Sequence, residues 1–230
     1  MKKFFLYTFA LAAMLVTFAS CSDDEYTDAR VTHYAEITLD GDDFMVVEKG
    51  SAYQEPGFYA EMNGEDVSSD VVVSSNVDTS MSGVYLVQYK YVNSDGFPAT
   101  AERTVAVLDT ADPYEGIYTV APGTHRNSGG NITSYSGYDL LIIRNGDDDT
   151  YTCEDLLGGY YYLRAGYGPN YAMSAGLSFN EDGTVELLGS HVPGWDDGAD
   201  SFEGTYSDGT FTYSVVYAGS LVFNVTMVKN

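Results

Sequence analysis

Short stretches of alternating apolar and polar residues run along the chain from about residue 34 to residue 230. They are rich in Val, Tyr, Thr and Phe, and Gly, Asn or Asp interrupts them at short intervals. A period of two is typical of half-buried β-strands, whereas an amphipathic helix needs a period near 3.6, which this chain does not show. The pattern therefore predicts an all-β protein.

The first part of this pattern, residues 34–109, predicts short strands at nearly regular spacing, which is typical of a β-sandwich. Its clearest strand places Tyr85, Val87 and Tyr89 on one face and polar residues on the other. The pair Asp95-Gly96 then favours a tight turn. The predicted strands are 35–39, 44–48, 57–61, 71–75, 83–91 and 102–108.

A polar segment with a proline, 109–113, separates this sandwich from a second module over 114–230. Asn145-Gly146, Asp182-Gly183 and Asp208-Gly209 predict tight hairpins between successive strands. Such a meander closes into a barrel or folds into a second sandwich, and we favour the barrel because closure leaves no exposed edge. The predicted strands are 116–121, 138–144, 150–153, 160–165, 175–179, 185–189, 202–206, 210–217 and 221–228.

The first residues have the layout of a secretory signal over 1–20, with Lys2 and Lys3 before an apolar run and small residues before Cys21. The alternative, a retained membrane helix, would need an apolar run of roughly 20 residues. Cys21 resembles the lipidated cysteine of a bacterial lipobox, although Phe18 stands where Leu is usual. The Ser-Asp-Asp-Glu sequence at 22–25 resembles the acidic export signal of Bacteroidota-type surface lipoproteins. These resemblances imply a lipid anchor on Cys21, a stalk over 21–33, and an outer-membrane location facing the outside of the cell.

The first module also resembles a bacterial immunoglobulin-like family, the domain of unknown function 5011/5012 group found in surface lipoproteins. Asn93 and Phe97 depart from the family's turn and weaken any calcium site inherited there. In the second module, the opening 116–118 and the turn 179–185 resemble lipocalins. The positions that carry the immunoglobulin-like resemblance are Asp78, Thr79, Gly83, Tyr85, Val87, Tyr89, Asp95, Gly96, Ala99, Arg103, Val105 and Val107, with the segment 50–57 upstream.

The charge of the chain excludes one class of partner. The formal net charge is −24, and it becomes −26 once Lys2 and Lys3 leave with the signal. Nucleic-acid binding depends on Lys and Arg contacts to phosphates, which this chain lacks, so no nucleic-acid partner is expected. Lipidation of Cys21 would leave Cys153 without a disulfide partner, and its place in an alternating stretch predicts a buried thiol.

No catalytic motif stands out. The three histidines His33, His125 and His191 lack metal-ligand spacing. A glycoside hydrolase needs only two carboxylates at a set separation, which a sequence with 34 acids can neither locate nor exclude. Clusters of Asp could ligate calcium, or they could be solvated turns. These clusters are Asp40, Asp42 and Asp43; Asp147, Asp148 and Asp149; and Asp196, Asp197 and Asp200.

The most informative chemistry of the second module is aromatic. If the run of three tyrosines lies on a strand, its side chains alternate between the two faces, and at least one is exposed. Aromatic planes pack on the apolar faces of sugars while nearby polar groups hold the sugar hydroxyls. The alternative is that these rings fill a barrel core. The candidate ligand-binding residues are Tyr160, Tyr161, Tyr162, Tyr167, Tyr171 and Trp195.

Three functions follow from these observations. The first is a non-enzymatic surface lipoprotein that binds a carbohydrate, with the first module as a spacer. Lipoproteins of this kind often accompany outer-membrane glycan importers, so the resemblance implies such an importer as a partner. The second is an adhesion or protein-interaction module, and the third is a glycoside hydrolase. A groove lined by Trp195 and tyrosines would favour sugar, and a flat patch would favour protein.

Overall fold

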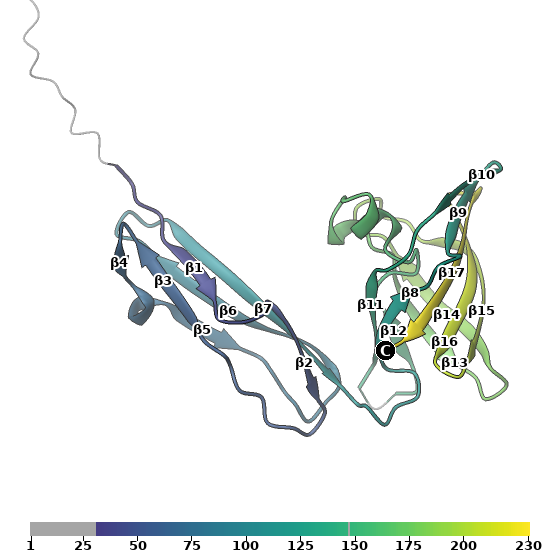
Figure 1. The fold of residues 1–230 in the computed structure, drawn as a ribbon, viewed down its shortest axis with the longest axis horizontal. Coiled ribbons are helices and arrows are strands. Elements are labelled where there is room, and N and C mark those ends of the chain that lie inside the picture. The colour runs from purple at the N-terminus through teal and green to yellow at the C-terminus, as the bar shows by residue number, and fades with distance from the viewer. Residues whose placement is uncertain (1–30, 147) are drawn as a thin grey trace, which may run out of the picture.

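The computed structural model describes residues 31–146 and 148–230, which form two β-modules in sequence (Figure 1). The predicted signal, the lipidation site Cys21 and the stalk up to residue 30 lie outside the described residues. Within the described part, no helix has the length and apolarity needed to cross a membrane.

The first module is a two-sheet sandwich. One sheet has the order β1-β3-β4, and the other has the order β2-β7-β6-β5. Its long hairpin, β6 with β7, turns at Asp95-Gly96 as predicted, and β2 pairs in parallel with β7. The strands are β1 (Glu36–Leu39), β2 (Phe44–Glu48), β3 (Phe58–Met62), β4 (Glu65–Asp66), β5 (Val72–Ser75), β6 (Gly83–Val92) and β7 (Pro98–Leu108).

A buried arginine organises the interior of this sandwich. Arg103 on β7 is completely buried, and its guanidinium donates to Glu55 Oε1 at 3.0 Å. It also donates to the carbonyl oxygens of Asp40, Asp42 and Gly57. A buried charge is tolerated only when it is paired and hydrogen-bonded, so Arg103 ties two loops to the strand that carries it.

The second module is a closed antiparallel barrel. Eight strands pair in the order β8, β11, β12, β13, β14, β15, β16 and β17, and β17 pairs back onto β8. Closure confirms the barrel over the second sandwich. The strands are β8 (Gly116–Val120), β11 (Asp139–Arg144), β12 (Tyr151–Cys153), β13 (Ser174–Phe179), β14 (Thr184–His191), β15 (Ala199–Ser207), β16 (Thr210–Tyr217) and β17 (Leu221–Lys229).

Two predictions for this module were wrong in detail. Residues 160–165 were expected to form a strand, but Tyr160–Arg164 is a short helix, η2, which follows Gly158 and Gly159 with φ of 65° and 77°. Such φ angles turn the chain out of the extended conformation. An additional hairpin, β9 (His125–Ser128) with β10 (Asn131–Ser134), was also missed. It extends from β17 beyond the barrel wall, so it lacks the apolar alternation of a core strand.

The two ends of the barrel differ in what they carry. We call the end formed by residues 121–138, 154–173, 192–198 and 218–220 the loop end, and the opposite end, where the chain enters from the first module, the junction end. In Figure 1 the hairpin β9-β10 and the green helical turns lie together at the loop end, while the C-terminus lies at the junction end. Cys153 is buried in the core between them, as the alternation predicted.

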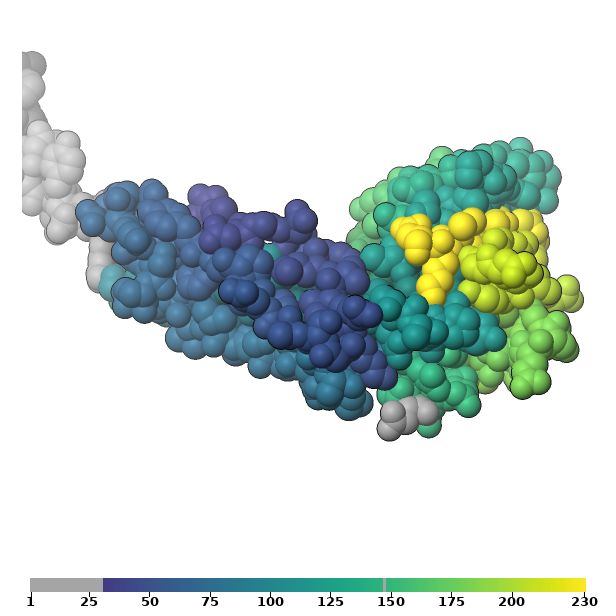
Figure 2. Space-filling model, turned by 60° about the horizontal axis from the view of Figure 1, so that its bottom comes forward, coloured from purple at the N-terminus to yellow at the C-terminus, as the bar shows by residue number. Residues whose placement is uncertain are grey.

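The modules meet side by side, and Figure 2 shows their surfaces in contact. One small apolar cluster joins Ala106 and Leu108 of β7 to residues on the outer face of β8 and β11: Ile117, Leu141 and Ile143. Beside it, Ser82 of the first module donates to the buried Glu115 at 3.0 Å. This contact combines buried apolar area with a polar bond, which opposes free rotation about the linker.

Candidate functional site

A buried carboxylate frames the loop end. Asp155 is fully buried and accepts backbone N–H bonds from Leu157, Gly159 and Met173 at 2.9, 3.0 and 3.0 Å. It thereby joins both ends of the long segment between β12 and β13. Burial raises the pKa of Asp155 to about 6, although the three N–H donors oppose that shift.

Above this frame, four of the six predicted aromatic residues form one cluster. The ring centroid of Trp195 lies 4.8 Å from those of Tyr161 and Tyr171, and 6.3 Å from that of Tyr167. Trp195 is 39% exposed and Tyr167 is 55% exposed. Most of these contacts are edge to face, a favourable geometry for aromatic quadrupoles. We call these four residues, Tyr161, Tyr167, Tyr171 and Trp195, the aromatic patch.

The loop that carries Trp195 is held by backbone contacts. Gly194 N–H donates to the carbonyl of Asn170 at 2.7 Å, which joins the two loops of the patch. A Cβ at Gly194 would lie 2.6 Å from the Tyr171 ring. The ring therefore packs directly on the backbone, and only glycine permits this approach.

Polar groups border the aromatic patch. The Tyr217 hydroxyl, whose ring contacts Tyr161 and Trp195, donates to the Asp197 carboxylate at 2.8 Å, and burial together with this bond raises the tyrosine pKa. Burial also raises the pKa of Tyr161, and the neighbouring Arg126 opposes that shift. Sequence reasoning missed Tyr217 and Arg126, because one belongs to a regular core strand and the other to the hairpin that was not predicted.

The remaining two predicted residues lie elsewhere. Tyr160 is 6% exposed and belongs to the barrel core beneath the patch, where its ring meets Tyr135, Tyr161 and Phe223. Tyr162 faces the first module across the outside of the barrel, in the groove described below. Consecutive residues of a helix point in different directions around its axis, so the three tyrosines reach three separate environments.

The carboxylates of the described residues form no group of three or more that could hold a metal ion, either alone or with His or Cys. Asp197 and Asp200 instead accept from Tyr217 and from the Gly219 N–H. Asn93, in the turn of the first module, accepts from the N–H groups of Asp95 and Phe97. Calcium therefore stays a prediction without a ligand set among these residues.

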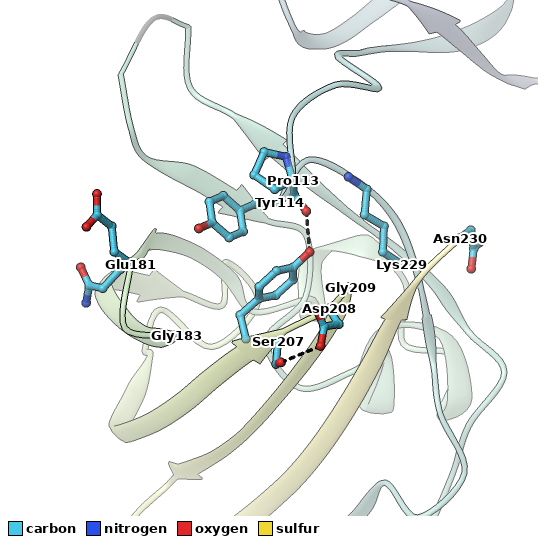
Figure 3. Close-up of a pocket in the computed structure, with 11 residues that line it drawn as sticks. Pro113, Tyr114, Glu181, Gly183, Ser207, Asp208, Gly209, Lys229 and Asn230 are labelled. Atoms are coloured by element: carbon cyan, nitrogen blue, oxygen red, sulfur yellow. Dashed lines mark hydrogen bonds between the residues drawn. The ribbon is translucent and has the colours of Figure 1, made fainter.

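Two cavities lie away from the aromatic patch. One, of about 640 Å³, opens at the junction end among the turns that Figure 3 shows. Its polar groups are largely engaged within the protein: the Tyr206 hydroxyl donates to the Pro113 carbonyl, and Lys229 donates to the Asp112 carbonyl at 2.6 Å. Its carboxylates, Glu181 and Asp208, are exposed, whereas a glycosidase places its general acid in apolar surroundings.

The second cavity, of about 450 Å³, is a groove between the modules. Phe44 and Val84, from the β2-β7-β6-β5 sheet of the first module, line it together with Leu141 and Tyr162 of the barrel. Neither cavity is lined by Tyr161, Tyr167, Tyr171 or Trp195. The aromatic patch is therefore outside both cavities and resembles an open platform.

Comparisons with known proteins agree with this two-module architecture. The bacterial surface protein Ig-like domain matches residues 37–107, and a family model for a C-terminal domain matches residues 107–229. The lipoprotein BT2262 from Bacteroides thetaiotaomicron, whose crystal structure is known, shares 40% sequence identity with this chain, and the two structures superpose with a TM-score of 0.76. The match covers 85% of this chain and 100% of that one. The chain belongs to the family of this lipoprotein.

Family membership confirms the immunoglobulin-like module and the surface-lipoprotein class that the sequence indicated. No curated protein matches the chain. A second solved structure, of CBM51-2 in complex with GlcNAc and INT domains from Clostridium perfringens ZmpB, matches at 14% identity with a TM-score of 0.28. It covers 85% of this chain and 43% of that one, and a likeness this weak carries no argument about the ligand.

Proposed function

We propose that this member of the BT2262 family is a non-enzymatic lipoprotein that binds an extracellular carbohydrate at the loop end of its barrel. In this proposal, lipid on Cys21 anchors the protein to the outer membrane. The immunoglobulin-like module then holds the barrel away from the lipid surface, with the protein facing the outside of the cell. An outer-membrane glycan importer is the expected partner.

One observation carries the choice of ligand: the aromatic patch combines exposed ring surface with polar groups at its border. Trp195 and Tyr167 offer apolar area to a sugar ring. Asp197 and the Tyr217 hydroxyl oxygen, which is fixed by its own bond to Asp197, stand beside it as acceptors for sugar hydroxyls. Aromatic surface with a few fixed polar groups is the usual composition of a small-ligand site.

A protein partner is the second candidate, and the openness of the patch favours it. Protein interfaces are flat, and their centres are enriched in Tyr and Trp. An aromatic patch that lines neither of the two cavities described above has this character. A glycoside hydrolase has no comparable support, because the acids of the junction cavity are exposed and the groove between the modules is lined by a single acid, Glu154, where two are needed.

A glycan array followed by calorimetry tests the proposal. The protein without residues 1–20 and with Cys21→Ser should bind at least one glycan class. The Trp195→Ala variant should bind it more weakly, and Tyr162→Ala, a ring of the same module outside the patch, should bind it like the parent. Two results together would favour a protein partner over a sugar. The protein would bind none of the plant, host and microbial glycans, and it would capture a surface protein that the Trp195→Ala variant fails to capture.

A further inference from the structure

Two of the cations in the described part of the chain, Arg126 and Arg164, are arginines at the loop end of the barrel. The described residues contain seven Lys and Arg side chains. Lys49, Arg103 and Arg144 each form an ion pair with a carboxylate. The other four form no ion pair with a carboxylate of the described residues: Lys229 donates to the Asp112 carbonyl, Lys90 is exposed on the first module, and Arg126 and Arg164 lie together at the loop end. In so acidic a chain, two cations left without carboxylate partners at one place need an explanation.

Both arginines converge on the ring of Tyr160, which lies beneath the aromatic patch. The Cζ atom of Arg126 lies 4.9 Å from the ring centroid of Tyr160, and that of Arg164 lies 5.1 Å from it. Arg126 comes from β9 and Arg164 from the end of η2, so distant segments of the chain bring them together. The two Cζ atoms are therefore at most about 10 Å apart, a separation that the acidic group and the neighbouring oxygens of one sugar unit can span.

The direction of Arg126 places it in the mouth of the barrel. In the ladder between β9 and β17, Arg126 stands opposite Phe223, whose side chain is fully buried in the core. Directly opposed residues project to the same face of a sheet. Arg126 therefore points inward beside Tyr160 and Tyr161, while the Arg164 side chain is exposed to solvent.

One donor of Arg126 is buried without an acceptor. Its Nε atom is inaccessible to solvent and has no hydrogen-bond partner among the described residues. A buried donor left in this state costs about 1–3 kcal/mol. Stacking of the guanidinium on Tyr160 stabilises the side chain by cation–π attraction, but it leaves the N–H unpaired. If Arg126 only covered the Tyr160 ring, its position would be explained, but its unpaired Nε–H would not.

We propose that Arg126 and Arg164 form an anion-binding corner of the glycan site, so that the preferred ligand is an acidic sugar. This inference rests on the proposed function and specifies its ligand class. The guanidinium groups hold the carboxylate or sulfate of one sugar unit, since planar guanidinium donors match such oxygens. The aromatic patch packs on the ring of that unit, and Asp197 at the border of the patch receives sugar hydroxyls.

The overall negative charge of the chain is compatible with this ligand. At physiological ionic strength the screening length is about 8 Å, so distant carboxylates act weakly on a bound anion. Direct contacts to a guanidinium group are screened much less. The same charge opposes highly charged polyanions, whose other groups would lie near Asp196 and Asp197.

Calorimetry with matched sugars tests the inference. The probes are a glucuronate-containing oligosaccharide, its uronate methyl ester, and a sulfated disaccharide of similar size. We expect the parent protein to bind an acidic form at least about 10-fold more tightly than the ester, which corresponds to about 1.4 kcal/mol. Arg126→Gln and Arg164→Gln should each remove most of this preference. Lys90→Gln removes one exposed charge from the first module and should retain it.

The outcomes separate this inference from the proposed function. Equal affinity for the acid and its ester would overturn the acidic class and leave carbohydrate binding in place. No binding of any sugar would overturn both. An arginine variant that weakens acid and ester alike would assign the side chain a structural role, and Arg164→Lys, which retains the charge, should keep part of the preference. Arginine-dependent binding of polyglutamate without binding of any sugar would replace the sugar by an acidic protein.

Discussion

The two ends of the barrel use the same eight strands for opposite purposes. At the junction end, hydroxyl, ammonium and carboxyl groups bond to the linker and to the first module, as Tyr206, Lys229 and Glu115 do. At the loop end, a fully satisfied carboxylate, Asp155, fixes the loops from below and leaves the rings above it exposed. At the junction end, polar bonds fix the barrel against the linker and the first module. At the loop end, the bonds of Asp155 fix only the loops of the barrel itself, and the aromatic rings stay exposed for a ligand.

The largest expected effect tests the frame of the loop end. Asp155→Ala would leave three buried N–H donors without an acceptor, at about 1–3 kcal/mol each, so we expect the free energy of unfolding to fall by about 3 kcal/mol or more. Asp155→Asn retains acceptor capacity and should lose less. Urea unfolding measures both. Ser136→Ala, at an exposed site of the same end, should change stability by less than about 0.5 kcal/mol. If Asp155→Ala lowered the free energy of unfolding by a similarly small amount, the loops would not depend on their bonds to Asp155.

The second prediction concerns the junction end and its dependence on pH. Burial raises the pKa of Glu115 to about 7, with Asp112 and Asp109 adding to the shift and the Ser82 hydroxyl opposing it. Lys229 is the nearby cation. Because the folded state binds this proton more tightly than the unfolded state, Glu115 contributes a loss of stability as pH rises from about 4.5 to about 7.

Glu115→Gln should therefore flatten the fall of unfolding free energy over that pH range, by about 1–3 kcal/mol. Thermal or urea unfolding at a series of pH values measures the slope, which is independent of any constant offset from the substitution. Asp155 also has a raised pKa and contributes a similar slope, so the wild-type curve should fall further than Glu115 alone explains. If the slope of unfolding free energy against pH were unchanged in Glu115→Gln, Glu115 would not contribute to the pH dependence of stability.

The third prediction tests whether the exposed rings serve binding rather than stability. Trp195→Ala should weaken glycan affinity by roughly 1 kcal/mol or more, as the loss of an aromatic contact does. Phe202→Ala, a partly buried ring of β15 outside the patch, should instead lower stability and leave the affinity unchanged. Calorimetry and urea unfolding of both variants make the comparison. Loss of stability alone in Trp195→Ala would make the patch part of the core.

The smallest expected effect concerns the backbone under Tyr171. Gly194→Ala places a methyl group against the ring, so the loop must shift, and we expect a stability loss of about 0.5–1 kcal/mol with a change in Trp195 fluorescence. Gly189→Ala is the matched control, because a Cβ there meets no atom within 4 Å. If both variants keep the parent's spectrum, the packing of Tyr171 on Gly194 does not position Trp195.

Much of the fold could be predicted because it depends on local patterns. Alternation located most of the paired strands but not β4, β9 or β10. Asp95-Gly96, Asn145-Gly146 and Asp208-Gly209 located turns, since a hairpin turn needs residues that tolerate positive φ. The same patterns failed at η2. There Asp155 and two glycines impose a helical turn on a tyrosine-rich segment, and alternation carries no information about such a contact.

The sequence by itself determined an all-β chain of two modules, its acidity, and the aromatic residues from which a surface could be made. Only the tertiary structure decided that the second module closes into a barrel, that Tyr161, Tyr167, Tyr171 and Trp195 meet, and that Tyr160 and Tyr162 do not join them. It also brought Arg126 and Arg164 to one ring. The physical reason is that strand propensity and turn chemistry act between near neighbours in the chain. Closure and the assembly of a site depend instead on contacts between loops that are far apart in sequence.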